Sequence, residues 1–288
     1  MIRNCAYLIL SGVITCTLLW FGTAQSSDWQ VTTAFIDLPE VSGLQIDGDS
    51  VYATFETRLN DGQIVSLNNG TRTIIVPDLQ KPDGLSTSLG RLIYTQEFGL
   101  APVYELHEGV STPLFNADGA EGVDSNSSGD VFIVEDRQDG RVLRYDRLTG
   151  LVAVLASGLD EAEGICAMDY GDVFFSEKSR GEVFRIREDV VELYLKGLNN
   201  PAYLHCDEAT QSIWITEDRQ NFGRLLHSSN PNDYSIVATG LKSPQSIAFN
   251  STDSFLLAEQ GRDRILLFER QEHESFGFDW SDFNMISK

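Results

Sequence analysis

Residues 162–177 read Ala-Glu-Gly-Ile-Cys-Ala-Met-Asp-Tyr-Gly-Asp-Val-Phe-Phe-Ser-Glu, which is two short apolar runs separated by a polar turn. The first run follows an acidic residue and a glycine, and the second ends in Glu177. Short runs rich in β-branched and aromatic residues, bounded by Gly and Asp, are typical of β-strands. This stretch therefore predicts an antiparallel hairpin.

The same pattern recurs along the chain with a period near 40 residues. Six apolar runs end in glutamate, and successive glutamates are 41, 38, 42, 40 and 42 residues apart. They are Glu56, Glu97, Glu135, Glu177, Glu217 and Glu259. A more variable position precedes each glutamate by 14 or 15 residues, held in turn by Ser42, Asp83, Glu121, Glu163, Ala202 and Gln245. A period of this length indicates stacked or radial repeats.

Two more short runs follow each glutamate, for example Arg141–Tyr145 and Leu151–Leu155. Four strands per unit and six units predict an all-β fold, a six-bladed β-propeller over residues 25–270. The last unit lacks a fourth run, whereas the N-terminal run Trp29–Ile36 resembles the fourth runs of the other units. We expect this N-terminal strand to complete the last blade, because closure leaves no sheet edge open.

The ends of the chain differ from the repeats. Arg3 precedes an almost wholly apolar stretch from Cys5 to Phe21, and small residues follow, which predicts a secretory signal peptide over residues 1–24. An uncleaved membrane anchor is the alternative, because the apolar run approaches the minimum for a spanning helix. We expect a secreted or periplasmic protein with an acidic aromatic tail at residues 271–288.

Two cysteines, Cys166 and Cys206, lie within the repeats. In an oxidising compartment they could pair, and free buried thiols are the alternative.

The chain carries 43 acidic and 21 basic residues, a formal net charge of -22. Such a surface repels nucleic acid and anionic membranes, so cations and small molecules are the expected partners of a monomer. Much of this charge is also explained by solubility alone.

Acidic residues begin the first strand of three consecutive units, at Asp83, Glu121 and Glu163. In antiparallel blades the start of strand one and the end of strand two meet beside the central axis, so these acids are expected to converge there. Clustered carboxylates suit Ca²⁺, which accepts six to eight oxygen ligands. We expect Asp83, Glu121 and Glu163 to bind this metal, with Glu135 and Glu177 as supports and Gln245 as a neutral oxygen.

The repeated glutamates also have an architectural interpretation. A residue type present in every blade is expected to have the same structural role in each blade, such as accepting backbone N–H hydrogen bonds from a neighbouring turn. His205, in the first strand of the fifth unit, is a candidate general base beside Glu163. A packed, hydrogen-bonded histidine is the alternative.

The repeats Ala120-Glu-Gly-Val and Ala162-Glu-Gly-Ile resemble the blades of the six-bladed superfamily of SMP-30/gluconolactonase, paraoxonase, strictosidine synthase-like and NHL-repeat proteins. This resemblance implies a catalytic Ca²⁺ at the channel mouth, held by residues that begin the inner strands. The segment Trp214-Ile-Thr-Glu217, followed by Phe222-Gly-Arg-Leu, is similar to the blades of streptogramin (virginiamycin B) lyases, which implies lyase chemistry beside Mg²⁺ as an alternative.

Together these features favour an exported, metal-dependent hydrolase of a lactone or ester, in which Glu163 or His205 activates water. The rival hypothesis is a non-catalytic propeller whose acidic face binds a cationic ligand or a protein partner, because one fold serves many functions.

Overall fold

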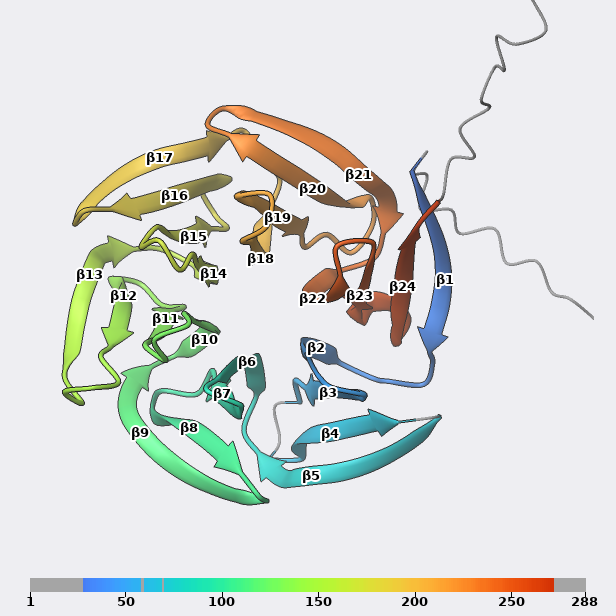
Figure 1. Cartoon of the computed structure of the whole chain (residues 1–288), viewed down its shortest axis with the longest axis horizontal. Helices are drawn as coiled ribbons and strands as arrows, with labels where there is room; N and C mark the ends of the chain where they lie inside the picture. Colours follow the sequence, from blue (N-terminus) through green and yellow to red (C-terminus); the bar gives the residue numbers. More distant parts are fainter. Residues whose placement is uncertain (1–27, 58–59, 69, 272–288) are drawn as a thin grey trace, which may run out of the picture.

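The computed structural model describes residues 28–57, 60–68 and 70–271, which form six four-stranded antiparallel sheets around a common centre (Figure 1). The first strand of each sheet lies nearest the centre and the fourth lies at the rim. The predicted six-bladed β-propeller is confirmed. The expected signal peptide and all but the first residue of the expected tail lie outside the described residues.

Strands that are consecutive in sequence are neighbours within five of the six blades. Blade 1 contains β2 (Val41–Asp47), β3 (Ser50–Phe55), β4 (Gly62–Asn68) and β5 (Thr71–Leu79). Blade 2 contains β6 (Pro82–Ser88), β7 (Arg91–Gln96), β8 (Leu100–His107) and β9 (Val110–Asp118). Blade 3 contains β10 (Ala120–Ser125), β11 (Val131–Glu135), β12 (Gly140–Tyr145) and β13 (Val152–Leu159).

The remaining blades follow the same order. Blade 4 contains β14 (Ala162–Ala167), β15 (Val173–Glu177), β16 (Glu182–Arg187) and β17 (Val190–Lys196). Blade 5 contains β18 (Pro201–Asp207), β19 (Ser212–Glu217), β20 (Gly223–Asn230) and β21 (Asp233–Leu241). Blade 6 contains β22 (Pro244–Ser251), β23 (Ser254–Glu259) and β24 (Arg264–Arg270), with the short 3₁₀ turn η1 (Gln260–Arg262).

The N-terminal strand closes the ring. β1 (Trp29–Phe35) pairs antiparallel with β24, which makes it the fourth strand of blade 6, as predicted. Trp29 packs edge-on against Phe255 and Trp214, with ring centroids 4.9 and 6.0 Å apart. Both ends of the described chain are therefore held in one sheet. No helix in this part of the chain is long and apolar enough to cross a membrane.

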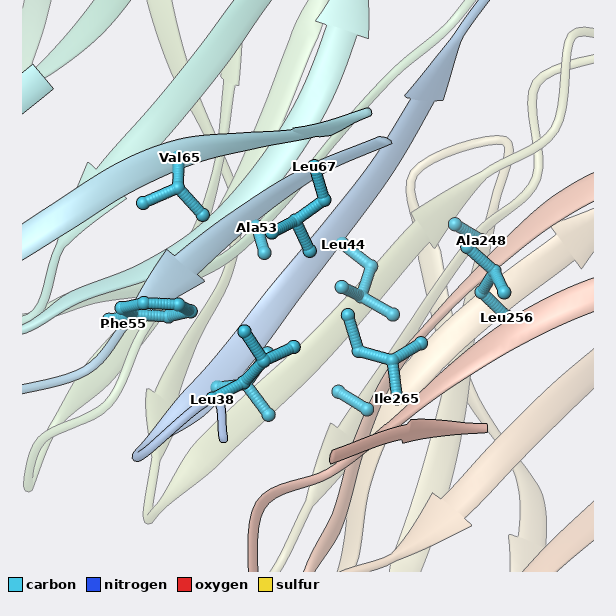
Figure 2. Close-up of a cluster of buried hydrophobic side chains, with 11 residues drawn as sticks. Leu38, Leu44, Ala53, Phe55, Val65, Leu67, Ala248, Leu256 and Ile265 are labelled. Carbon is cyan, nitrogen blue, oxygen red and sulfur yellow. The ribbon is translucent and has the colours of Figure 1, made fainter. Parts of the chain in front are cut away.

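Apolar side chains are buried between neighbouring blades. The second strands β11 and β15 are buried at every residue, which explains why their sequences are almost continuously apolar. Figure 2 shows one such cluster, where Leu44 and Phe55 of blade 1 lie with Leu256 and Ile265 of blade 6. Packing of this kind fixes each blade against the next and holds the inner strands around the channel.

Glycines let the inner strands approach one another closely. The same position in the first four blades is held by Gly43, Gly84, Gly122 and Gly164. A Cβ at Gly164 would lie 2.0 Å from the carbonyl oxygen of Ala202 in the next blade, and the other three would meet an equivalent carbonyl at 2.3 Å. In blade 4 the Ser176 hydroxyl accepts the Gly164 N–H and donates to that Ala202 carbonyl. These contacts hold the backbone at each glycine, and so they also position the residue directly before it.

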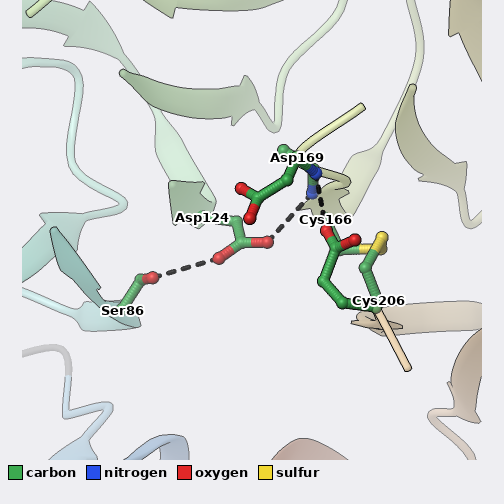
Figure 3. Close-up of a disulfide and its surroundings, with 7 residues drawn as sticks. Ser86, Asp124, Cys166, Asp169 and Cys206 are labelled. Carbon is green, nitrogen blue, oxygen red and sulfur yellow. Dashed lines mark hydrogen bonds between the residues drawn. A yellow bond between two sulfur atoms is a disulfide. The ribbon is translucent and has the colours of Figure 1, made fainter. Parts of the chain in front are cut away.

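A disulfide joins the inner strands of blades 4 and 5. Cys166 and Cys206 are bonded, with Cα atoms 5.5 Å apart, so the paired alternative is confirmed (Figure 3). Nearby, Asp124 of blade 3 accepts hydrogen bonds from the Ala167 N–H at 2.9 Å and the Ser86 hydroxyl at 3.1 Å (Figure 3). Four inner strands are thus tied together at this level of the channel.

Candidate functional site

A cavity of about 580 Å³ lies where the inner strands begin, and the described residues that line it include no apolar side chain. Its lining consists of eight carboxylates, two lysines and three uncharged polar side chains. These are Glu40, Glu56, Asp61, Asp83, Glu121, Asp136, Glu163, Asp218, Lys81, Lys178, Thr57, Gln245 and Gln260. Most sites for drug-sized ligands are largely apolar, so this lining suits a cation or a small, highly polar molecule.

An inner ring of residues contributes Asp83, Glu121, Glu163 and Gln245 to the lining. It comprises the second residue of each first strand: Ser42, Asp83, Glu121, Glu163, Ala202 and Gln245. All six residues are buried, although four of them carry a carboxyl or amide group. The structure therefore brings Asp83, Glu121, Glu163 and Gln245 together in the cavity, as the sequence predicted.

An outer ring comes directly after the second strand of each blade. Its members are Glu56, Glu97, Asp136, Lys178, Asp218 and Gln260. The backbone N–H of each donates to the carbonyl of the residue before the first strand of its blade, at 2.8 to 3.1 Å. In five blades that preceding residue is not glycine and has φ between 41° and 57°. Because this left-handed turn recurs around the propeller, it belongs to the architecture and not to one site.

The six repeated glutamates do not occupy the same structural position in every blade. The prediction that each of them ends the second strand of its blade is wrong in blades 1 and 2. In blade 3, Glu135 pairs with Ala120, the first residue of the inner strand. The matching partners in blades 1 and 2 are Phe55 and Gln96. Glu56 and Glu97 come one residue later and therefore belong to the outer ring.

The four remaining glutamates accept backbone hydrogen bonds from the segments that precede the inner strands. Glu135 accepts the Asp118 N–H at 2.9 Å and two hydrogen bonds from Arg141 at 2.7 and 2.6 Å. Although burial opposes them, these bonds keep the pKa of Glu135 below its usual value. Glu177 likewise accepts the Asp160 N–H at 2.9 Å, and Glu217 and Glu259 accept equivalent N–H groups. The structure does not bring Glu135 or Glu177 to the cavity.

Two lysines neutralise three of the cavity carboxylates and the neighbouring Glu97. The Lys81 ammonium lies 3.4 Å from Glu56 and also forms an ion pair with Glu97. Lys178 pairs with Glu163 and, at 2.9 Å, with Asp218. Although burial opposes the effect, these two carboxylates raise the pKa of Lys178, so its ammonium stays charged at neutral pH.

Carboxylate oxygens of Glu97, Glu121 and Asp136 lie within 4.8 Å of one another, and we name this set the Glu121 cluster. Glu121 Oε2 is buried and has no hydrogen-bond partner among the described residues. Burial, followed by the carboxylates of Glu163 and Asp83, raises the pKa of Glu121 well above its usual value. A buried, unpartnered carboxylate oxygen beside two further carboxylates fits a divalent cation with oxygen ligands.

A second set of carboxylate oxygens shares Glu97. It contains Glu56, Asp83 and Glu97, again within 4.8 Å of one another, and we name it the Glu56 cluster. Burial, followed by the charge of Glu56, raises the pKa of Asp83 to about 8. Lys81 forms its ion pairs with two of the three members of this cluster.

Tyr203 reaches across the channel and supports Asp83. It replaces the glycine of the first four blades, and its hydroxyl lies 2.8 Å from the Ser42 hydroxyl of blade 1. Ser42 in turn donates to Asp83 Oδ1 at 2.6 Å. The Ser42 hydroxyl has one hydrogen and donates it in the hydrogen bond to Asp83. The Tyr203 hydroxyl is therefore the donor in its hydrogen bond to Ser42. This chain fixes the Asp83 carboxylate at the base of the cavity.

His205 lies outside the cavity lining. Its ring stacks on Phe249, with centroids 4.6 Å apart and planes 16° apart. Burial lowers the pKa of His205 to about 4, against a smaller opposing effect of Asp207. The structure therefore places this candidate base against an aromatic ring and outside the cavity that Glu163 lines.

Glu97 and Asp136 were not predicted as partners of Glu121, nor were Lys81, Lys178 and Tyr203 predicted as parts of the site. One signal was available for Tyr203, because it breaks a run of glycines at one repeat position. A signal for Lys81 was also present, since no other residue directly before an inner strand is basic.

The fold, not the sequence, links this chain to known proteins. No family model and no curated protein matches its sequence. A gluconolactonase from Xanthomonas campestris is similar with a TM-score of 0.72, covering 86% of this chain and 92% of its own, at 10% identity. An auxiliary nutrient binding protein from Bacteroides thetaiotaomicron has a TM-score of 0.68, covering 86% of this chain and 78% of its own, at 13% identity.

A virginiamycin B lyase from Staphylococcus aureus has a TM-score of 0.61, covering 85% of this chain and 100% of its own, at 14% identity. Similarity at these identities is evidence of fold alone. The chain is thus a six-bladed β-propeller with the architecture of gluconolactonase-like and streptogramin lyase propellers.

Proposed function

We propose that this protein is a metal-dependent hydrolase that opens a polar lactone or ester, with a divalent ion, Ca²⁺ by its ligand chemistry, at the Glu121 cluster. The observation that carries the proposal is the buried, unpartnered Glu121 oxygen within 4.8 Å of Glu97 and Asp136 oxygens. Carboxylates so arranged repel one another unless a cation or protons intervene. The polar side chains that line the cavity among the described residues support a hydrophilic substrate.

Each part of the cavity has a proposed role. A bound ion would polarise the substrate carbonyl and lower the pKa of a water molecule beside it. Asp83, held by Ser42, takes the proton of the attacking water and returns it to the leaving oxygen. Lys178, fixed by Glu163 and Asp218, donates a hydrogen bond to a substrate oxygen. Glu163 therefore acts by holding Lys178.

Export to a secreted or periplasmic location is part of the same proposal. The Cys166–Cys206 disulfide supports it, because disulfides persist in oxidising compartments. The N-terminal sequence pattern favours the same location.

The test is a panel of small polar lactones and esters, assayed with purified protein in Ca²⁺ and after chelation. We expect turnover that chelation abolishes and that Glu121→Gln lowers by about 100-fold or more, since several kcal/mol of transition-state stabilisation would be lost with the ion. Glu108→Gln is the matched control, because Glu108 is an exposed carboxylate in the turn between β8 and β9.

Turnover that persists at full rate in chelator or in Glu121→Gln would contradict the proposal. A protein that binds Ca²⁺ or an organic cation at these carboxylates but turns over no ester or lactone would favour the rival hypothesis of a cation-binding propeller. The eight carboxylates of the lining are the observation behind that second candidate.

A further inference from the structure

Two carboxylate clusters of similar dimensions lie at the cavity and share Glu97. The Glu121 cluster has a buried oxygen without a hydrogen-bond partner among the described residues and pairs with the Lys81 ammonium only through the shared Glu97, whereas that ammonium pairs with two members of the Glu56 cluster. We infer that Lys81 is a built-in cation that occupies the place of a second divalent ion and so limits the cavity to one metal. This inference rests on the proposed metal site.

The position of Lys81 supports this role. Lys81 is the residue before the inner strand of blade 2 and has φ of 44°. Its N–H donates to the Thr57 carbonyl, and its own carbonyl accepts the Glu97 N–H, so its backbone is fixed on both sides. The side chain is 21% exposed and directed at Glu56 and Glu97, which are 18% and 15% exposed. The ammonium is therefore held by the site and is not a freely moving surface charge.

Coordination chemistry explains why the lysine and a metal exclude each other. Three carboxylate oxygens within 4.8 Å of one another can all reach one Ca²⁺, whose oxygen ligands lie at 2.3–2.6 Å. The Lys81 ammonium pairs with two of these three carboxylates. An ion placed there would have to displace a positive charge, which Coulomb repulsion opposes.

Lys178 provides a matched control in the same cavity. It has the same charge and also bridges two carboxylates, Glu163 and Asp218. No set of three carboxylate oxygens within 4.8 Å includes either of them among the residues that the structure describes. Removing this lysine makes the cavity equally more negative but exposes no set of three ligands.

The experiment is calorimetric titration with CaCl₂ of the wild-type protein and of Lys81→Met, Lys178→Met and the double variant Lys81→Met/Glu56→Gln. We expect one ion in the wild type, two in Lys81→Met, and one in the other two variants. The second ion in Lys81→Met should bind at least about 10-fold more tightly than any second event in Lys178→Met, a difference of about 1.4 kcal/mol. Should Lys81→Met fail to fold, Lys81→Gln tests the same loss of charge.

The outcomes separate this inference from the proposed function. One ion in both the wild type and Lys81→Met overturns the inference and leaves the proposed metal site intact. A second ion in Lys178→Met as well would also overturn it, because net charge alone would then explain the gain. No ion in the wild type but one in Lys81→Met contradicts the proposed function and overturns the inference as stated, because Lys81 would then exclude the first ion and not a second. No ion in either protein contradicts both.

Discussion

Tyr203 and His205 lie two residues apart on β18 but have different surroundings. The Tyr203 hydroxyl joins a polar chain that ends at Asp83, whereas the His205 ring stacks on Phe249. The lowered pKa of His205, about 4, means that the folded state disfavours the imidazolium form. The associated stability is fully present above the unfolded pKa of about 6.5 and is lost as pH falls toward 4.

Replacing His205 should therefore remove part of the acid sensitivity of the fold. We expect the free energy of unfolding of the wild type to fall by about 2–3 kcal/mol more than that of His205→Phe between pH 7 and pH 4.5. Urea unfolding at the two pH values measures this difference. The exposed His107→Gln serves as the control and should behave as the wild type. Equal pH dependence in the wild type and His205→Phe would contradict a histidine that is kept neutral by its packing.

At the scale of strands, the inner strands pack backbone against backbone, and glycine makes this possible. A Cβ at Gly164 would lie 2.0 Å from the Ala202 carbonyl oxygen and 2.9 Å from the Leu204 nitrogen. Backbone atoms cannot move aside as a flexible side chain can. The equivalent position in blade 6, Ser246, has room for a side chain that accepts the Leu44 N–H at 3.1 Å.

We expect Gly164→Ala to lower the free energy of unfolding by about 3 kcal/mol or more, because overpacking here forces two strands apart. Ser246→Ala, at the same repeat position, should cost only about 1 kcal/mol, the value of one hydrogen bond. Denaturant unfolding of both variants tests the comparison. Similar small losses in the two variants would show that the blades can separate easily at this point.

The strand pattern was predictable from the sequence, whereas the register of the hairpins was not. Apolar runs and turn residues indicated four strands per blade, and the three acids of the inner ring were placed correctly in the cavity. The outer ring was missed because residue counts do not reveal loop length. β2 and β3 are joined by two residues, Gly48 and Asp49, whereas the loop between β10 and β11 is longer. Glu97 consequently lies beside Glu121 and Asp136, two residues of the cavity lining, while Glu135 binds Arg141 outside that lining.

For the whole molecule, the disulfide links blades that are already held by the closed ring. Cys166 and Cys206 are 40 residues apart in sequence, about one blade. Closing a loop of that length in the unfolded chain corresponds to about 4 kcal/mol of stabilisation in the chain-entropy model. The sequence left the pairing open, because a free thiol and a half-cystine give the same pattern.

We expect the Cys166→Ala/Cys206→Ala double variant to keep the propeller fold but to unfold at lower denaturant concentration, with a loss of about 4 kcal/mol or less. A reducing agent should shift the unfolding curve of the wild type toward that of the variant and leave the variant unchanged. An unchanged wild-type curve after complete reduction would show that closure by β1 alone sets the stability.

A crystal structure of the protein grown in millimolar CaCl₂ would show whether a divalent cation binds at the Glu121 cluster. We expect one strong peak at about 2.3–2.6 Å from carboxylate oxygens of Glu97, Glu121 and Asp136, with Lys81 still paired to Glu56. A cavity without such a peak, or an ion bound elsewhere in the molecule, would contradict the proposed metal site.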